Sequence, residues 1–320
     1  VDRKDLPCAA HFPFDGSLAL RGRWQSVFEE QDLVGEPQEW GKAYIEPLYA
    51  ELKEPYPYVA CIVADGDRMG RAISSLSSAA HHRLLSLNLS AFAGRARGVV
   101  EQTHQGVTVY AGGDDVLAFV PVANALSCAK ELQLCFDESL AHDSLSAENR
   151  PTLSIGLGIG HVMESMGDLL SLGRLAEREA KRSRNALAVV LDKRSGGQRF
   201  WSATWDTNPV STLARDGALL NAQLSVRKIY EIERLVMQLP EDPAAEDRAW
   251  TRLLALEVQR SLSRVEGSSL NAEMVNLDLS EEVGYLELRQ RVKDWISRLL
   301  IAREFIAALP SPLKVGVESA

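Results

Sequence analysis

The stretch that decides the fold is Tyr110-Ala111-Gly112-Gly113-Asp114-Asp115-Val116, in which two glycines and two adjacent aspartates separate two apolar runs. The flanking segments, 107–111 and 115–120, are rich in β-branched and aromatic residues, which favour strands. Glycine supplies the positive φ angles that a tight turn demands. The stretch therefore predicts a β-hairpin that carries Asp114 and Asp115 together at its tip.

Two neighbouring carboxylates repel each other, so this arrangement is most useful where a hard cation neutralises them. Magnesium prefers oxygen ligands and serves nucleotidyl and phosphoryl transfer in this way. Glycine and aspartate are also the usual residues of solvent-exposed turns. Taken alone, the four residues 112–115 leave a metal site and a solvated turn equally open.

A second acidic element favours the metal site. Residues 58–64 read YVACIVA, a continuous apolar run that predicts a strand buried on both faces, and DGDRMG follows at 65–70. Gly66 and Gly70 allow the backbone to approach a ligand closely, and a helix expected directly afterwards could direct its first amides at phosphate. Asp65 and the hairpin pair could share a metal if they lie at the same end of adjacent strands.

Two more segments complete a resemblance to a known family. Residues 154–161 read SIGLGIGH, and residues 180–186 read AKRSRNA. Together with residues 65–70 and 110–121, and in this order, they make the region of about 55–200 resemble the large polymerase/cyclase-like subunit of type III CRISPR effector complexes, most closely in the Cmr branch. The resemblance implies a ferredoxin-like palm related to GGDEF diguanylate cyclases and class III adenylyl cyclases. It also implies an antiviral enzyme that converts ATP into cyclic oligoadenylate and pyrophosphate when target RNA is bound.

The resemblance assigns roles to individual residues. In the family, the first aspartate after strand one and both hairpin aspartates hold the two metals, so the catalytic and metal-binding positions here are Asp65, Asp114 and Asp115. Three carboxylates can bridge two Mg²⁺ or Mn²⁺ ions about 4 Å apart, one activating a 3′-hydroxyl and the other stabilising pyrophosphate. Lys181 matches the family lysine that reaches the triphosphate, although a solvated helix cation is the alternative.

The remaining candidates line the expected nucleotide pocket. The hairpin glycines let the backbone approach the nucleotide, and Ser154, on a flanking strand, is a candidate contact for ribose or base. The Gly66 carbonyl is a further possible metal ligand. Asp67 either faces the metal or caps the following helix. The expected nucleotide-binding residues are Gly66, Asp67, Gly70, Gly112, Gly113, Ser154 and Lys181.

An α+β organisation is expected for the 320 residues, with a lead-in segment at 1–50, the palm at 51–200 and a helical domain at 201–320. The palm order is βαββαβ with an added strand, which is the ferredoxin-like plan. Its expected strands are 58–64, 107–111, 115–120, 152–161 and 187–191, and its expected helices lie within 69–99, 122–140 and 167–183. Helical spacing of apolar residues then predicts a bundle with seams that include Leu253, Leu256, Leu262, Leu288, Val292, Trp295 and Leu299.

Composition sets further bounds. The net charge of −9 argues against a surface that coats nucleic acid non-specifically. No apolar run reaches the length of a membrane span and the N-terminus lacks the plan of a signal peptide, so a cytoplasmic protein without membrane contact is expected. The four cysteines include no C-x-x-C pair, which indicates neither a zinc knuckle nor a disulfide framework.

The expected partners follow from the resemblance. They are the other effector subunits, crRNA and target RNA, and a second palm that completes the nucleotide site. The chain begins abruptly at Val1 and resembles only part of a longer subunit, so the second palm would come from a missing N-terminal half or from a homodimer. His142-Asp143 spells the dipeptide of an HD nuclease, but without further ligands it is attributed to chance. A stripe of Arg248, Arg252, Arg260 and Arg264 is either a solvated helix face or a surface for RNA or a subunit.

Two other functions remain open. A diguanylate-cyclase-like enzyme is one, although Val116-Leu117 stands where that family has an acidic-aromatic pair. The other is a catalytically silent scaffold that binds crRNA, target RNA and neighbouring subunits. Three clustered carboxylates argue against the scaffold, because their repulsion destabilises a domain that does not use them.

Overall fold

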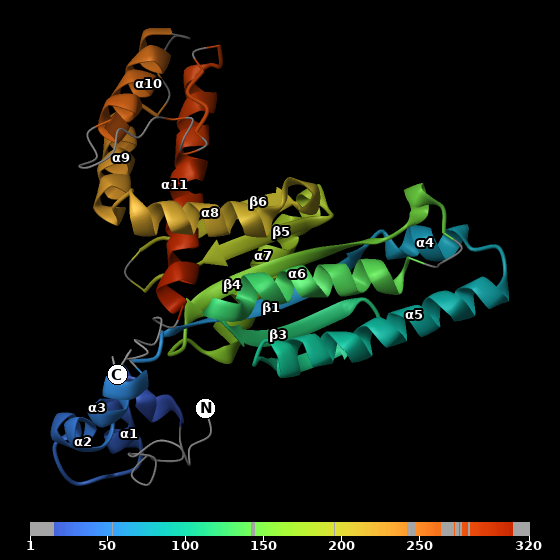
Figure 1. Cartoon of the computed structure of the whole chain (residues 1–320), viewed down its shortest axis with the longest axis horizontal. Coiled ribbons are helices and arrows are strands. Elements are labelled where there is room, and N and C mark those ends of the chain that lie inside the picture. Colours follow the sequence, from blue (N-terminus) through green and yellow to red (C-terminus); the bar gives the residue numbers. More distant parts are fainter. Residues whose placement is uncertain are drawn as a thin grey trace, which may run out of the picture. The chain divides into compact units, whose positions relative to one another are not determined.

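The computed structural model describes residues 16–52, 54–141, 145–194, 196–241, 243, 248–263, 272, 275, 277–280 and 282–309. The chain divides into two compact units, Val1–Pro57 and Tyr58–Ala320. The larger unit contains a six-stranded sheet in the order β2-β3-β1-β4-β5-β6, with helices packed against it and following it (Figure 1). This mixed architecture confirms the predicted α+β fold.

The smaller unit is built from short helices: α1 (Trp24–Glu30), α2 (Pro37–Tyr44) and α3 (Glu46–Leu52), preceded by 3-10 turns η3 (Gly16–Ala19) and η4 (Arg21–Arg23). Its core is the cluster Leu18, Trp24, Val27, Ile45 and Leu48. The Trp24 indole is fully buried and donates a hydrogen bond to the Leu18 carbonyl at 2.9 Å. The segment expected to be a lead-in therefore has a small core of its own.

The strands of the larger unit are β1 (Tyr58–Asp67), β2 (Val107–Gly112), β3 (Asp115–Pro121), β4 (Thr152–His161), β5 (Ala186–Leu191) and β6 (Arg199–Thr204). β1 pairs antiparallel with both β3 and β4, β4 runs parallel to β5, and β6 returns antiparallel to β5. The five predicted strands are all present.

Two features of the sheet differ from prediction. β1 continues through Asp67 instead of ending at Ala64, because all ten of its residues find partners along β4. Asp65 and Asp67 therefore lie on a strand and not in a turn. β6 was not predicted, although its sequence RFWSAT contains aromatic residues and threonine that favour strands.

The helices of this sheet region are α4 (Met69–Ser75), α5 (Ala79–Gly98), α6 (Val122–Ser139) and α7 (Met166–Ser183), with a short π-helix η5 (Val99–Thr103) after α5 and a 3-10 turn η6 (Ala147–Asn149) before β4. The single helix expected within 69–99 is two helices. Ser78 caps the second by accepting a hydrogen bond from the His81 amide at 3.2 Å. Serine competes for backbone groups in this way, so the serine-rich stretch 74–78 is a natural place for the break.

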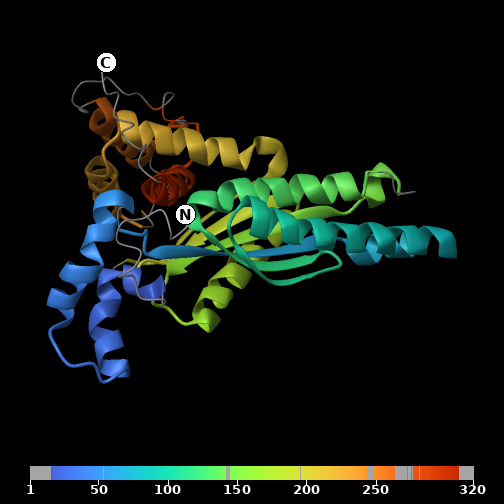
Figure 2. The same ribbon diagram turned by 60° about the horizontal axis from the view of Figure 1, so that its bottom comes forward.

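The sheet lies between α6 on one face and α7 on the other (Figure 2). α7 packs closely on β1, β4 and β5 because glycines of β4 leave room for its backbone. A Cβ atom on Gly156 would lie 2.1 Å from the Glu177 amide nitrogen, and one on Gly158 would lie 2.3 Å from that of Gly173. This close approach brings Lys181, near the end of α7, to the end of β1.

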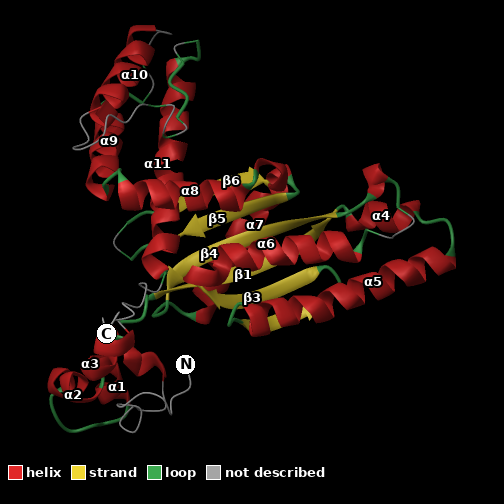
Figure 3. Cartoon of the chain, viewed as in Figure 1, coloured by secondary structure: helices red, strands yellow, loops and turns green. Residues whose placement is uncertain are grey.

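After the 3-10 turn η7 (Trp205–Thr207), the chain forms α8 (Pro209–Ala222), α9 (Val226–Gln238), α10 (Arg248–Ser263) and α11 (Tyr285–Ala308) (Figure 3). These helices share one apolar core, and α11 also contacts β6 and α6 of the sheet region. The division of the larger unit into a palm and a helical domain near residue 200 remains a prediction.

The two predicted seams of the bundle fare differently. Leu288, Val292, Trp295 and Leu299 of α11 are buried as expected. On α10, Leu262 is buried but Leu253 and Leu256 are 40% and 55% exposed, and Leu254 and Val258 take their place in the core. Because apolar residues stand at neighbouring positions of α10, the sequence is compatible with burial of either face. In the structure, packing buries the face with Leu254 and Val258 and not the predicted face with Leu253 and Leu256.

Several expectations concern residues outside or at the edge of the described structure. His142-Asp143 and Arg264 lie outside the described residues. On the described part of α10, Arg260 pairs with Glu257 at 3.4 Å, which is what a solvated face would show.

Within the described ranges, no helix is both long enough and apolar enough to span a membrane.

Candidate metal and nucleotide site

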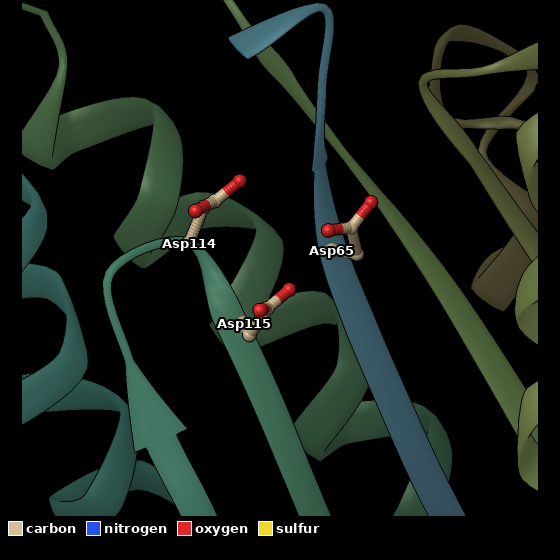
Figure 4. A group of neighbouring side chains, drawn as sticks. All are labelled: Asp65, Asp114 and Asp115. Atoms are coloured by element: carbon tan, nitrogen blue, oxygen red, sulfur yellow. The ribbon is translucent and has the colours of Figure 1, made fainter. Parts of the chain in front are cut away.

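Asp65, Asp114 and Asp115 come together at one end of the sheet (Figure 4). Asp65 lies on β1, Asp115 begins β3, and the antiparallel pairing of Ala64 with Val116 brings these two strand ends side by side. One carboxylate oxygen from each residue lies within 4.8 Å of the other two. The structure therefore unites the three aspartates that the sequence predicted as metal ligands. We call them the acidic triad.

The hairpin that carries two of these aspartates has a two-residue turn. Gly112 pairs with Asp115, which leaves Gly113 and Asp114 as the turn residues. Gly113 has φ of 63°, whereas Gly112 does not have a positive φ, so only one glycine of the pair needs the conformational freedom expected of both. At Gly112 a Cβ atom would lie 2.5 Å from the Tyr110 hydroxyl, which is the far end of an exposed side chain that can move aside.

Gly66 makes room for the Asp114 side chain. A Cβ atom on Gly66 would lie 2.5 Å from Asp114 Oδ2 and 2.8 Å from its Cβ. The Gly66 backbone also hydrogen-bonds the Asp114 carboxylate. By contrast, a Cβ atom on Gly70 would meet nothing within 4 Å, so the structure gives no packing reason for that glycine.

The electrostatics of the acidic triad favour a bound cation. Burial, a hydrogen bond with Asp65 and the charges of Asp65 and Asp114 raise the pKa of Asp115 to about 7. Burial also raises the pKa of Asp114, to which the charge of Asp65 adds. Lys181 opposes both shifts without abolishing them. Carboxylates whose pKa is raised by burial and by mutual repulsion are stabilised in their ionised form by a hard divalent cation.

Lys181 is directed at β1. Its Nζ atom donates to the main-chain carbonyls of Asp65 at 3.0 Å and Gly66 at 2.9 Å. It lies 3.2 Å from Asp67 Oδ1 and forms an ion pair with the Asp65 carboxylate. An ammonium has only three hydrogens to donate, so these four acceptors saturate it. The predicted contact of Lys181 with a triphosphate remains a prediction, and it requires one of these bonds to open.

Asp67 and Ser154 are buried and hydrogen-bond each other. Asp67 is 2% exposed and Ser154 is fully buried, and the serine hydroxyl donates to the carboxylate at 2.9 Å. Contrary to expectation, Ser154 has no surface to offer a ribose or base. Asp67 does not cap α4 either, because the residue at that position is Arg68, with φ of 57° and no side-chain cap.

Three further residues at this end of the sheet were not predicted. Thr152 donates to Asp67 Oδ2 at 2.7 Å, and the Asn185 amide donates to the same oxygen at 2.8 Å. Burial raises the pKa of Glu177, which lies one turn before Lys181 on α7 and within the field of Asp65. Of these three, Thr152 could have been found from the sequence, because Thr152 and Ser154 are hydroxyl residues two positions apart at the start of an otherwise apolar strand.

Comparison with known proteins finds a family whose palm domain is similar to this region. The family model "Cas10/Cmr2, second palm domain" matches residues 58–188. Over 192 residues the chain is 32% identical to the CRISPR system Cmr subunit Cmr2 of Pyrococcus furiosus, a match that covers 51% of this chain and 22% of that protein. The chain thus spans about a fifth of the length of this relative.

Solved structures agree on the fold. The structure of a Csm1-Csm4 cassette in complex with cA4 matches with a TM-score of 0.50 and 17% identity, over 78% of this chain and 36% of that one. The apo cassette matches with a TM-score of 0.50 and 19% identity over the same shares. Residues 58–188 of this chain are therefore similar to the second palm domain of the Cas10/Cmr2 family.

Proposed function

We propose that this chain is the nucleotidyltransferase part of a type III CRISPR effector and makes cyclic oligoadenylate and pyrophosphate from ATP. The observation that carries the proposal is the convergence of Asp65, Asp114 and Asp115 within a region similar to the second palm domain of this family. A sheet end that served only as a scaffold would gain nothing from three mutually repelling carboxylates.

The acidic triad fits Mg²⁺ or Mn²⁺, since it offers oxygen ligands only and carries excess negative charge. We propose that Asp65, Asp114 and Asp115 hold two such ions, which would lower the pKa of an attacking 3′-hydroxyl and neutralise the leaving pyrophosphate. Gly66 keeps β1 clear for the Asp114 carboxylate. Asp115, with a pKa of about 7, releases its proton near neutral pH and so becomes a full ligand there.

The nucleotide contacts belong to the same proposal. Gly112 and Gly113 form the hairpin backbone next to the acidic triad, and Gly66 and Gly70 lie on either side of the turn that follows β1. We propose that ATP lies along these segments. Lys181 reaches a phosphate only by giving up one of its four acceptors on β1.

An uncovered part of the sheet supports a second palm as partner. The pairing register places Val107 and Tyr110 of β2 on the same face of the sheet that α7 covers at β1 and β4. At β2 that face is exposed, since these two residues are 65% and 55% exposed. Joining two ATP molecules requires a second nucleotide with its 3′-hydroxyl in line. We propose that a second palm, from another part of a longer protein or from a second copy, docks beside Asp115 and holds that nucleotide.

Partner subunits follow from the relatives. The solved Csm1 proteins form a cassette with Csm4, and Cmr2 is a subunit of a CRISPR system. We propose that this chain likewise acts within an effector that contains crRNA and responds to target RNA.

The test is turnover of labelled ATP with Mg²⁺ or Mn²⁺ by the assembled effector bound to target RNA. Asp114→Asn should abolish oligoadenylate formation, because loss of a metal ligand costs orders of magnitude in rate. The control is Asp294→Asn, which changes an exposed carboxylate on α11. Turnover of GTP in place of ATP would favour a diguanylate-cyclase-like enzyme, and a folded wild-type effector without turnover would favour a scaffold.

A further inference from the structure

Asp67 lies close to the acidic triad but, unlike its three aspartates, has a buried side chain. Its side chain is 1% exposed, whereas that of Asp65, two residues earlier on the same face of β1, is 38% exposed. Within the described residues, the group of carboxylates able to share a metal comprises Asp65, Asp114 and Asp115 without Asp67. A buried charge needs compensating partners, and Asp67 has them within the protein.

Hydrogen-bond donors occupy both carboxylate oxygens of Asp67. The Ser154 hydroxyl lies 2.9 Å from each oxygen, and Thr152 and the Asn185 amide donate to Oδ2 at 2.7 and 2.8 Å. The Lys181 ammonium lies 3.2 Å from Oδ1. These donors stabilise the ionised carboxylate without any metal.

One of those partners, the Asn185 amide, joins Asp67 to the turn between α7 and β5. Arg184 has φ of 58° and ψ of 167°, a region used almost only by glycine, and Asn185 has φ of 44°. Such backbone persists only where its surroundings hold it. The bond from the Asn185 amide to Asp67 holds this turn, and the turn fixes the end of α7 that carries Lys181.

We propose that Asp67 is a positioning residue of the acidic site, which contacts neither metal nor nucleotide and acts by holding Lys181 and the α7–β5 turn. Lys181 divides its three hydrogens among acceptors that include the carboxylates of Asp65 and Asp67. Of these two carboxylates, only that of Asp65 remains charged when Asp67 is neutralised. The Lys181 ammonium then pairs more strongly with Asp65 and competes with a metal ion for that carboxylate. The proposal rests on the proposed function for its catalytic meaning, but not for its test.

The first measurement uses the metal-free full chain. In wild type, Lys181 should react slowly with an amine-acetylating reagent. In Asp67→Asn, mass spectrometry should show the acetylation rate of Lys181 rising by about fivefold or more, which corresponds to the interaction energies measured between residues of one hydrogen-bond network. Lys193, which is paired with the buried Glu304, serves as the internal reference. Equal Lys181 rates in wild type and variant would overturn the proposal. If Asp67→Asn does not fold, Thr152→Val removes one bond to Asp67 without changing charge and should give a smaller rise.

The second measurement is a double-mutant cycle on Mn²⁺ affinity, with Asp67→Asn, Lys181→Met and the double variant. Asp67→Asn should weaken Mn²⁺ binding by about fivefold or more in the wild-type background and by clearly less when Lys181 is already methionine. The same loss in both backgrounds would show that Asp67 does not act through Lys181. Wild-type protein that bound no Mn²⁺ would refute the metal site of the proposed function, while the acetylation rates would still decide the role of Asp67.

Discussion

Replacing Asp115 with asparagine should stabilise the metal-free protein and destabilise the metal-loaded protein relative to wild type. At the 4.8 Å that bounds the oxygen separations in the acidic triad, two unit charges repel by about 0.9 kcal/mol at the dielectric constant of water and about 3.5 kcal/mol at 20. Asp115 is exposed, so solvent screens much of this repulsion, and Lys181 opposes it. We therefore expect a gain of about 1 kcal/mol at pH 8, or about 2–4 °C in melting temperature.

The gain should depend on pH in a defined direction. The pKa of Asp115 is about 7 in the folded protein, against 3.8 for a free aspartate. Taken in full, this shift corresponds to about 4 kcal/mol, but Asp115 is exposed and solvent screening reduces the effect, so the gain of about 1 kcal/mol worked from the charge separation is the expected one. Between the two pKa values the folded state holds a proton that the unfolded state has released, so the stability of wild type falls as pH rises through this window. Asparagine has no such proton. The advantage of Asp115→Asn should therefore be complete at pH 8 and absent below about pH 4.

Metal should reverse the order of stability. A ligand at one hundred times its dissociation constant stabilises the folded state by about 2.7 kcal/mol, and the variant should lose most of that effect. Melting curves of wild type, Asp115→Asn and the control Asp294→Asn, with and without Mn²⁺ at pH 4 and 8, measure all of these differences. Equal stabilisation of wild type and Asp115→Asn by Mn²⁺ would remove Asp115 from the metal site. A metal-free gain that is the same at both pH values would refute the repulsion.

Three further outcomes can be checked. Arg184→Gly should raise the free energy of unfolding in urea by about 1 kcal/mol, because relief of a glycine-type conformation outweighs the entropy that glycine loses; a loss of stability would show that the side chain contributes more than the strain. Gly158→Ala should cost about 3 kcal/mol, since its Cβ would strike the backbone of α7, whereas Gly94→Ala in α5, with nothing within 4 Å, should gain about 1 kcal/mol. If a second copy completes the nucleotide site, specific activity should fall as the chain is diluted through its dimer dissociation constant; vigorous synthesis by a demonstrated monomer would contradict the need for a second palm.

The parts of the fold that could be predicted from sequence are those that local patterns specify. The run at 58–64 and the alternation around the hairpin locate strands without knowledge of their partners, and the long periodic segments locate α6 and α7 to within one residue. The acidic triad could be anticipated because two strand ends each carry aspartate next to glycine. These are patterns in which the chemistry of the side chains and the backbone propensity agree.

The parts that could not be predicted depend on pairing partners. DGDRMG contains turn-forming residues, yet β1 continues through its first three positions because β4 supplies a paired residue for each. The core face of α10 is decided by the helices around it, since Leu253 and Leu254 are equally apolar. In both cases the sequence permits two local arrangements and tertiary contacts select one.

The same pairing explains why one strand can carry two aspartates with different tasks. Residues two apart on a strand share a face, so Asp67 points to the same side as Asp65, and β4 places Thr152 and Ser154 opposite Asp67 and Asp65 in the register. Both hydroxyls donate to Asp67, whereas the carboxylate of Asp65 pairs with Lys181 of α7. A carboxylate whose oxygens are already occupied by hydrogen-bond donors binds a metal ion weakly. A carboxylate that lies beside two other carboxylates binds a metal ion more strongly, because the cation relieves their repulsion. The hydroxyls of β4 thus support the proposed division of the two aspartates, with Asp67 as a positioning residue and Asp65 as a metal ligand.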